Sequence, residues 1–489
     1  MLSTAAIAWH PWRAESFARA RAENKPVLLW MAPAWCRHSA GMDSSTFGDA
    51  DVAGLVNAQF VAVRVDADRR PDIADRYGLG AWPTTVFLTP AGDVLGGGTY
   101  IEAPRLADVL RRVSTAFTNG LPAGALAKAG SSPQPAAAGD DAATVEQLTE
   151  QVTAAFDSDY GGFGTAPKFP HASPVRLALL LYKEDGSDQH RDIAVTTLDA
   201  MGWGPLHDEH DGGFFRCARR PDWGEPDDEK LLDVNASLLD LYVEAYDRLE
   251  LTRYFERAED VLRYVQTWLA DPVDAGWAGS QRADPAYHAA ARDSLTAREA
   301  PPVDRTLYTD WNAAMASAAL KAGRVMNDTA LSEFAIRSLE RLALLCYRPG
   351  AGVAHYFDGE AQVRGLLGDQ ITMAIAQLDA FEATGNIVYE MLAEELALYA
   401  VGTMWDEERG GFFDRAAGDE GDVGLLGERR KPFVTNCAAA RLLKRLGHAA
   451  KKPRFTTLAD RTVAAMHPRA AAEGPLAAEF VLAVRETGQ

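Results

Sequence analysis

Three carboxylate residues stand near the starts of predicted helices and could do acid–base chemistry. Glu229, Asp310 and Asp369 lie at or near the start of stretches with helical spacing in the second part of the chain. Glycoside hydrolysis needs two carboxyl groups, one protonated acid and one base, held about 5–10 Å apart. We therefore expect two of these three residues to supply the acid and the base. The structural alternative is a helix cap, because Asp and Glu are common at helix starts.

Polar and aromatic residues near the same helix starts and loops could bind a sugar. Tryptophan rings stack on the C–H faces of sugars, while carboxylates and amides bond to the hydroxyl groups. The alternatives are structural, since Trp223 and Trp311 could pack in the core and Lys168 could pair with a buried carboxylate. The expected substrate-binding residues are His171, Lys168, Asp208, Arg216, Trp223, Lys230, Asn235, Trp311, Asn312 and Asn436.

A histidine pair also has the spacing of some metal sites. His207 and His210 form an H-x-x-H pattern beside Gly212, in a predicted loop. A zinc site needs at least three protein ligands, and the sequence shows no third one. We expect no metal and no cofactor.

One cysteine lies where a nucleophile could be activated. Cys36 follows a predicted buried strand and precedes a predicted helix, with Arg37 beside it. The helix dipole and the neighbouring charge both lower a thiol pKa there. The position resembles the active-site cysteine of thioredoxin-like proteins. The resemblance extends to residues 77–84, where such proteins carry a cis proline, so we expect a cis Trp82–Pro83 bond.

The second thiol of a thioredoxin is missing. Ser39 stands three residues after Cys36, so a dithiol cycle is not available. Cys36 could still form a mixed disulfide that glutathione or a partner protein resolves. The alternative is a relic of the fold that packs against Pro83.

Predicted helices and strands alternate along residues 1–118, the part of the chain that contains Cys36. This alternation predicts an α/β domain, and the position of Cys36 makes it resemble a thioredoxin-like one. Three continuous apolar runs have the length of buried strands, and a hairpin follows the last of them. The expected strands cover 26–31, 60–65, 84–88 and 94–95, and the expected helices cover 15–24, 43–58 and 71–77.

The remaining elements predict a second domain of a different class. Residues 119–143 are almost all small residues with Pro and Gly, typical of a flexible linker. In residues 144–489, Gly-rich signals recur every 50–75 residues, with paired amphipathic helices between them. This pattern predicts an all-α (α/α)6 toroid of six hairpins. The clearest pairs are 228–250 with 252–270, 310–325 with 329–347, and 369–383 with 387–404.

The net charge of -20 comes from the second domain alone. Residues 1–118 hold 12 basic and 12 acidic residues, and the remainder holds 37 and 57. Such a charge repels nucleic acid and anionic membranes, and no apolar run is long enough to span a bilayer. An acidic funnel also disfavours phosphorylated or uronic-acid ligands. The four scattered cysteines favour a reducing, cytoplasmic location.

Short motifs in both domains resemble the family of thioredoxin-domain proteins that includes spermatogenesis-associated protein 20. They include Trp9–Trp12, Val65–Ile73, Gly80–Pro90, Gly161–His171 and Glu382–Gly385, in the family's order. The resemblance implies a thioredoxin-like domain before a toroid similar to N-acylglucosamine 2-epimerases and six-hairpin glycosidases.

This chain departs from that family at three motifs. The family usually has C-x-x-C followed by His, where this chain has Ser39 and Ala40. It usually has His at the places of Phe215 and Asp227. Histidines suit the acid and base roles of an epimerase because their pKa lies near neutrality. Their loss here favours glycosidase-like over epimerase-like activity.

Three hypotheses follow from these residues. The first is a toroid that binds or processes a carbohydrate-like small molecule. The second is a monothiol redox module that captures protein partners through Cys36. The third is a non-catalytic scaffold.

Overall fold

The computed structural model describes residues 6–120, 143–288, 299–418 and 421–487. The chain forms two compact units, Met1–Gln134 with Ala417–Arg430, and Pro135–Ala416 with Lys431–Gln489. Most of the expected linker, residues 121–142, lies outside the described residues. The four cysteines are buried and free, and none of the described helices is both long and apolar enough to cross a membrane.

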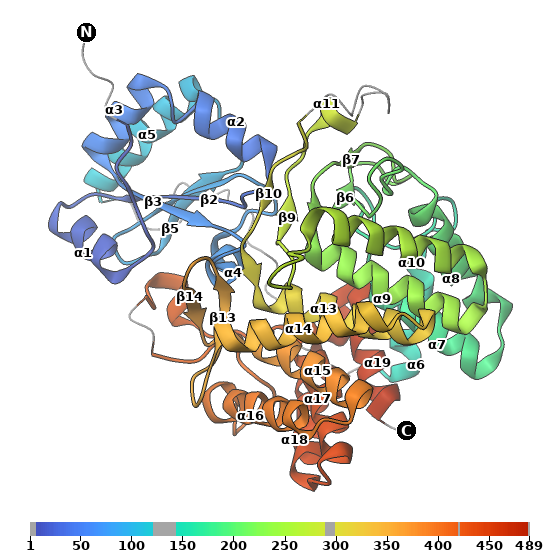
Figure 1. Cartoon of the computed structure of the whole chain (residues 1–489). Coiled ribbons are helices and arrows are strands. Elements are labelled where there is room, and N and C mark those ends of the chain that lie inside the picture. The colour runs from blue at the N-terminus through green and yellow to red at the C-terminus, as the bar shows by residue number, and fades with distance from the viewer. Residues whose placement is uncertain (1–5, 121–142, 289–298, 419–420, 488–489) are drawn as a thin grey trace. The chain divides into compact units, whose positions relative to one another are not determined.

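The first unit is a five-stranded sheet with helices on both faces (Figure 1). The strand order is β1-β3-β2-β4-β5. Strands β1, β3 and β2 are parallel, β4 is antiparallel to β2, and β5 is antiparallel to β4. Its elements are β1 (Trp9–His10), α1 (Ala14–Ala22), β2 (Val27–Ala32), α2 (Arg37–Ser45), α3 (Ala50–Gln59), β3 (Val61–Asp66), α4 (Pro71–Tyr77), β4 (Thr84–Leu88), β5 (Val94–Gly98) and α5 (Ala103–Thr118).

Strand β2 is buried along its whole length because both faces of the sheet are covered. Leu28 and Trp30 join the core cluster on one face, and Leu29 and Met31 join the cluster on the other. This alternation is the period of two that a strand imposes. It explains why the sequence shows a continuous apolar run, and together with the helices on both faces it confirms the expected α/β class of this part.

The helix expected over 43–58 is two helices. Asp49 interrupts it because its side chain accepts hydrogen bonds from the backbone N–H groups of Asp51 and Val52, which makes it the N-cap of α3. The helical spacing continues across this break, so periodicity alone did not show it.

A segment from far along the chain completes the first unit. Within Ala417–Arg430, Leu426 is fully buried in the core cluster that also holds residues of α1, α4 and β2. Arg76 of α4 donates from Nε to the carbonyl of Leu425 at 2.9 Å and from Nη2 to that of Glu428 at 2.6 Å. The sequence did not place this segment with the first unit.

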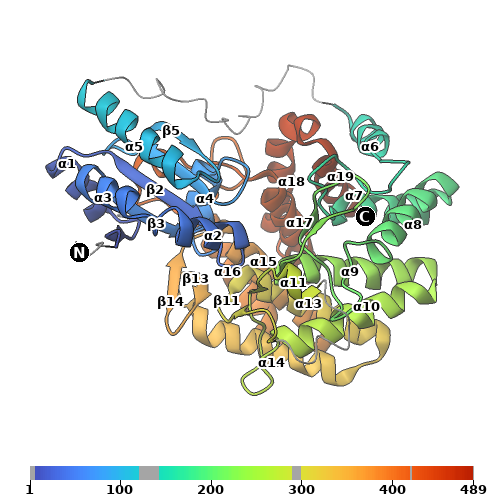
Figure 2. The ribbon, with the colours of Figure 1, turned by 90° about the horizontal axis from the view of Figure 1, so that it is seen from above.

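The second unit is a closed ring of six helical hairpins (Figure 2). The inner helices contact one another in the order α7, α9, α13, α15, α17, α19 and back to α7. Their outer partners are α8, α10, α14, α16, α18 and α6. The last hairpin thus joins the two ends of the unit, which confirms the expected (α/α)6 toroid.

The helices of this unit, with one π-helical and two 3-10 segments of the chain, are α6 (Val145–Ala154), α7 (Ala172–Asp185), α8 (Asp188–Gly202), α9 (Leu232–Leu249), α10 (Thr252–Tyr264), η1 (Val265–Leu269), α11 (Pro285–His288), α13 (Thr309–Met326), α14 (Thr329–Cys346), α15 (Leu367–Thr384), α16 (Ile387–Met404), η2 (Gly424–Gly427, in the first unit), α17 (Phe433–Ala449), α18 (Pro453–Met466), η3 (His467–Leu476) and α19 (Ala477–Thr487). Short strands connect several hairpins. They are β6 (Cys217–Ala218), β7 (Pro226–Asp227), β8 (Lys230–Leu231), β9 (Ser280–Gln281), β10 (Val303–Asp304), β11 (Leu307–Tyr308), β12 (Tyr347–Arg348), β13 (Gly352–Phe357) and β14 (Ala361–Arg364).

Candidate functional site

The Gly-rich loops of the toroid share one architecture. Each begins with an Asp whose Oδ1 accepts a hydrogen bond from the backbone N–H of the residue two positions later. In three of the loops the same oxygen also accepts the N–H of the residue three positions later. Each ends on an aromatic residue that follows a glycine with positive φ. At Gly213 a Cβ atom would come within 2.5 Å of Tyr264, so glycine is needed there for space as well as for conformation. The four loops start at Asp157, Asp208, Asp271 and Asp406.

Lysines that were expected to bind substrate neutralise these loops instead. Lys168 is fully buried and bonds to Asp157 at 2.6 Å. Lys230 is also fully buried and bonds to Asp208 and to the carbonyl of Gly212. Lys168, Lys230 and Asp208 therefore have a structural role in ion pairs within the loops.

The asparagines expected at the substrate are also structural. The Asn235 amide accepts the N–H of Phe214 at 2.8 Å and donates to the carbonyls of Phe214 and Leu231. Asn312 and Asn436 make the same set of bonds in their own repeats. We call these side chains the amide clamps. Both N–H groups and the carbonyl oxygen of each amide are thus bonded to backbone groups.

The two expected tryptophans have different surroundings. Trp223 is 2% exposed, lies beneath the Lys168 ammonium, and donates to the carbonyl of Tyr160 at 3.0 Å. It therefore packs in the core. Trp311 packs against the core cluster with its ring centroid 4.7 Å from that of Tyr308, and it remains partly exposed.

The amide clamps fix the register of neighbouring inner helices. Asp233 precedes the clamp Asn235 by two residues on α9, and Asp310 precedes Asn312 by two residues on α13. The two carboxyl groups therefore occupy equivalent positions at the starts of adjacent helices. Neither makes a side-chain cap, because the cap residues are Leu231 and Tyr308.

On the next inner helix, α15, the register changes by one residue. Gln370 is the clamp of this repeat and bonds to both backbone groups of Val353 in β13. Asp369 directly precedes it, so it is rotated by about 100° relative to the Asp310 position on α13. The clamped strand carries His355, whose Nδ1 lies 2.9 Å from Asp369 Oδ1.

These side chains form a compact acidic cluster. One ligating atom each of Asp310, His355 and Asp369 lies within 4.8 Å of the others. Asp369 and His355 are 1% and 3% exposed, and Asp369 Oδ2 is buried without a hydrogen-bond partner among the described residues. We call Asp233, Asp310, His355 and Asp369 the acidic cup.

Two carboxyl groups of the cup, those of Asp233 and Asp310, hold protons more tightly than usual. Burial, then the charge of Asp369, raises the pKa of Asp310 to about 7. Burial raises the pKa of Asp233 to about 6. Asp233 lies close enough to Asp310 for its charge to add to the shift of Asp310. Near neutral pH, Asp310 can therefore both donate and accept a proton.

Glu229 stands beside the cup and is engaged by Arg216. The Arg216 Nε atom lies 2.6 Å from Glu229 Oε1, and its Nη2 lies 2.8 Å from Asp227 Oδ2. Burial raises the pKa of Glu229 against the opposing charge of Arg216. The guanidinium lies over Phe169, whose ring is 6.2 Å from that of His171 at the N-cap of α7. Glu229 is thus held in an ion pair with Arg216.

The histidines of the H-x-x-H pattern do not form a metal group among the described residues, and His207 Nε2 lies 2.5 Å from Asp260 Oδ2 instead. A different set, Asp208, Asp211 and His288, brings one ligating atom each within 4.8 Å of one another. The ammonium of Lys230 bonds to Asp208 there, and it would oppose a metal cation. The atoms of Asp310, His355 and Asp369 are the other such group among the described residues.

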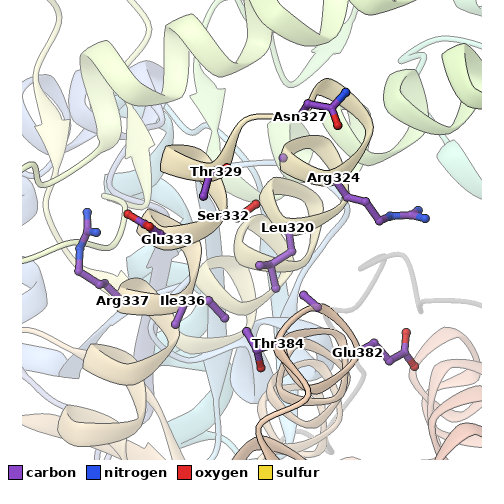
Figure 3. Close-up of a pocket in the computed structure, with 12 residues that line it drawn as sticks. Leu320, Arg324, Asn327, Thr329, Ser332, Glu333, Ile336, Arg337, Glu382 and Thr384 are labelled. Carbon is purple, nitrogen blue, oxygen red and sulfur yellow. The ribbon is translucent and has the colours of Figure 1, made fainter.

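A cavity of about 750 Å³ lies near the far ends of inner helices α13 and α15 (Figure 3). Arg324 and Arg337 project from its rim in different directions over a floor that includes Leu320 and Ile336. Because its polar groups do not converge, it lacks the arrangement of a catalytic site.

In the first unit, Cys36 is the N-cap residue of α2 and is 6% exposed. Trp82–Pro83 is cis, as expected. Ser39 is buried, and its Oγ has no hydrogen-bond partner among the described residues.

Sequence reasoning missed Asp233 and His355. Asp233 had a signal, because Asp233-Val234-Asn235 repeats the D-x-N pattern of Asp310-Trp311-Asn312. His355 had none, since it lies in a strand that the helical pattern did not predict.

Comparisons with known proteins agree with both units. The thioredoxin-like family described as "Protein of unknown function, DUF255" matches residues 2–128. Human spermatogenesis-associated protein 20 is 30% identical over 338 residues, which cover 62% of this chain and 41% of that protein. Uncharacterized protein B0495.5 of Caenorhabditis elegans is 30% identical over 285 residues, covering 53% and 38%. The chain thus spans about two fifths of the length of these relatives.

Solved structures resemble the toroid. Cellobiose 2-epimerase from Bacillus thermoamylovorans has a TM-score of 0.53 at 12% identity, covering 65% of this chain and 85% of that chain. D-mannose isomerase has a TM-score of 0.52 at 16% identity, covering 65% and 83%. A GH76 alpha-mannanase of Bacteroides thetaiotaomicron has a TM-score of 0.51 at 12% identity, covering 69% and 96%. At such identities the likeness shows the fold alone. Residues 2–128 thus carry the DUF255 thioredoxin-like domain, and the chain joins it to an (α/α)6 toroid and is similar to spermatogenesis-associated protein 20.

Proposed function

We propose that the toroid binds a carbohydrate-like small molecule at the acidic cup and processes it by acid–base chemistry. The observation that carries the proposal is the pair of carboxyl groups in unlike surroundings. Asp310 is partly exposed with a pKa of about 7, while Asp369 is buried against His355. A carboxyl group whose pKa is raised toward neutrality and that lies beside a second carboxyl group is typical of acid–base sites.

The proposed roles follow from position. Asp310 donates the proton, since it carries one for a large fraction of the time near pH 7. Asp369 accepts a proton, with His355 hydrogen-bonded to its other oxygen. Trp311, next to Asp310, offers a face on which a sugar ring can stack. The structural neighbours named for cellobiose, mannose and mannan support a carbohydrate ligand by analogy of fold.

Two reaction classes fit this arrangement, hydrolysis and epimerisation. The sequence argued against epimerisation because histidines are missing at Phe215 and Asp227. His355 supplies a histidine at the cup from another part of the chain, so we propose that both classes be tested. The ligand is proposed to be uncharged or cationic, because the carboxylates of the cup repel anions.

Binding is tested with the full chain and a panel of neutral mono- and oligosaccharides. We expect at least one sugar to raise the melting temperature by a few degrees, because a ligand that binds only the folded state stabilises it. Isothermal titration would give the Kd, and Asp369→Asn should weaken it at least tenfold. Glu333→Gln, in the cavity of Figure 3, is the control and should leave binding unchanged. No shift with any sugar would contradict the proposal and favour a scaffold.

A second candidate function is capture of protein partners through Cys36. The position of this thiol favours it, because Cys36 is the N-cap residue of α2 after a buried strand and lies in the domain matched by the thioredoxin-like family. The free cysteines fit a reducing compartment, which we propose to be the cytoplasm.

Trapping in an oxidised lysate tests this second function. We expect mixed-disulfide adducts with the wild-type chain, and their loss in Cys36→Ser. Cys217→Ser is the matched control and should retain them, because burial raises the pKa of the Cys217 thiol to about 12. Adducts that persist in Cys36→Ser, or that never form, would exclude the mechanism.

A further inference from the structure

Asp233 and Asp310 are equivalent residues of two neighbouring repeats. Their helices α9 and α13 contact each other directly, and an Asn amide clamp follows each carboxyl group after one intervening residue. Because the clamps hold both helices to their loops in the same way, the two side chains leave their helices in the same direction relative to the ring. Both are partly exposed at helix starts.

Asp233 makes no ion pair and no long-range hydrogen bond among the described residues that would give it a structural role. Its carboxylate accepts the N–H of Val234 at 2.7 Å and the N–H of its own backbone. Arg216 is the nearby cation, and its guanidinium is shared by Glu229 and Asp227. A carboxyl group that is mostly removed from water without a counter-charge is costly to keep.

The rest of the cup shows the same shortage of partners. Within the described part of the chain, Asp369 Oδ2 is buried and has no hydrogen-bond partner. The one hydrogen bond that Asp310 accepts from the described residues comes from the N–H of the adjacent Trp311. Acceptors thus outnumber donors around the cup, which is suited to a ligand rich in hydroxyl donors.

We infer that Asp233 contacts the ligand together with Asp310, and that the pair selects a ring bearing neighbouring free hydroxyl groups and no negative charge. This inference rests on the proposed function. The carboxyl oxygens of the pair that carry no proton and accept no backbone N–H accept the ring's hydroxyl hydrogens, which supplies donors that the protein does not provide there. Carboxylate or phosphate groups on the ring are excluded because they would add charge of the same sign.

The test measures the Kd of the full chain for the tightest-binding neutral sugar of the panel. Asp233→Asn keeps the size of the side chain but loses an acceptor, and we expect it to weaken binding 10–100-fold. Asp233→Glu, which moves the carboxylate outward by one methylene, should weaken binding less. Val434→Ala is the matched control, because Val434 has the equivalent place on α17, two residues before the clamp Asn436. It should leave the Kd unchanged.

The outcomes separate this inference from the proposed function. If the wild type binds a sugar and Asp233→Asn binds it equally well, the role of Asp233 is overturned while the cup remains a sugar site. If methylation of the ring hydroxyls leaves the Kd unchanged, the selection for free hydroxyls is overturned. If no sugar binds the wild type, the proposed function fails and this inference fails with it. Circular dichroism of each variant confirms that loss of binding is not loss of fold.

Discussion

Replacing Asp310 with Asn is expected to stabilise the protein by about 2–4 kcal/mol at pH 8 and to change little near pH 4. The pKa of Asp310 is about 7 in the folded protein, against about 4 in an unfolded chain. The stability that this carboxyl group contributes is therefore complete below pH 4 and is lost as pH rises to 7. Asn stays neutral at every pH, so the variant does not undergo this loss.

Denaturant unfolding between pH 4 and pH 8.5 measures the effect. Asp406→Asn is the control, and its effect on the free energy of unfolding should have the opposite sign. The reason is that the hydrogen bond from Lys431 lowers the pKa of Asp406 to about 2. The contribution of Asp406 is present above pH 4 and is lost as pH falls toward 2, so this variant should be destabilised at pH 8. An Asp310→Asn protein that is less stable than wild type at pH 8 would show that the carboxylate is favourably paired.

The same variant should bind its ligand poorly or process it slowly. Removing a general acid usually costs about 10²–10⁴-fold in rate. A substitution that stabilises a protein and abolishes its chemistry marks a functional residue, since function alone explains why the costly group is there.

Replacing Lys230 with Met should lower the free energy of unfolding by about 3–5 kcal/mol, the usual cost of leaving a buried charge without its partner. Asp208 is 3% exposed, and Lys230 is fully buried. Burial alone would raise the pKa of Asp208, but the charge and hydrogen bond of Lys230 outweigh it and hold the pKa below its usual value. Without the lysine, the carboxylate must either stay charged in the core or take up a proton.

Two further variants show whether burial is the cause. Lys431→Met removes the corresponding lysine of a later repeat, where the side chains of Lys431 and Asp406 are 16% and 15% exposed. It should cost about 1 kcal/mol or less, since solvent screens partly exposed pairs. The double variant Lys230→Met/Asp208→Asn should recover part of the stability. Equal losses at the two lysines would contradict this account.

The sequence predicted the two folds because their signals are periodic and strong. The apolar runs of the first unit marked β2, β3 and β4, and the repeated Gly-rich loops marked the hairpins of the toroid. The break at Asp49 was missed because helical spacing continues across it. The insertion of Leu426 was missed because nothing in a local pattern records which distant surface a loop residue fills.

The candidate site was predicted only in part, for a physical reason. Position near a helix start identified Asp310 and Asp369 but did not distinguish them from Asn235 or Lys230, which serve the loops. The distinction depends on which hydrogen-bonding groups are already occupied, and this is decided by residues tens of positions away. His355 reaches the cup only because the Gln370 clamp holds its strand.

The return of residues 417–430 to the first unit has a consequence for the order of synthesis. A ribosome that has made the whole sheet of this unit has not yet made Leu426 or the carbonyls that bind Arg76. The nascent thioredoxin-like unit must therefore wait, with part of its core uncovered, until more than 300 further residues have been translated. In evolution the same arrangement ties the two units together, because a gene fusion that carried only the first 120 codons would transfer an incomplete domain.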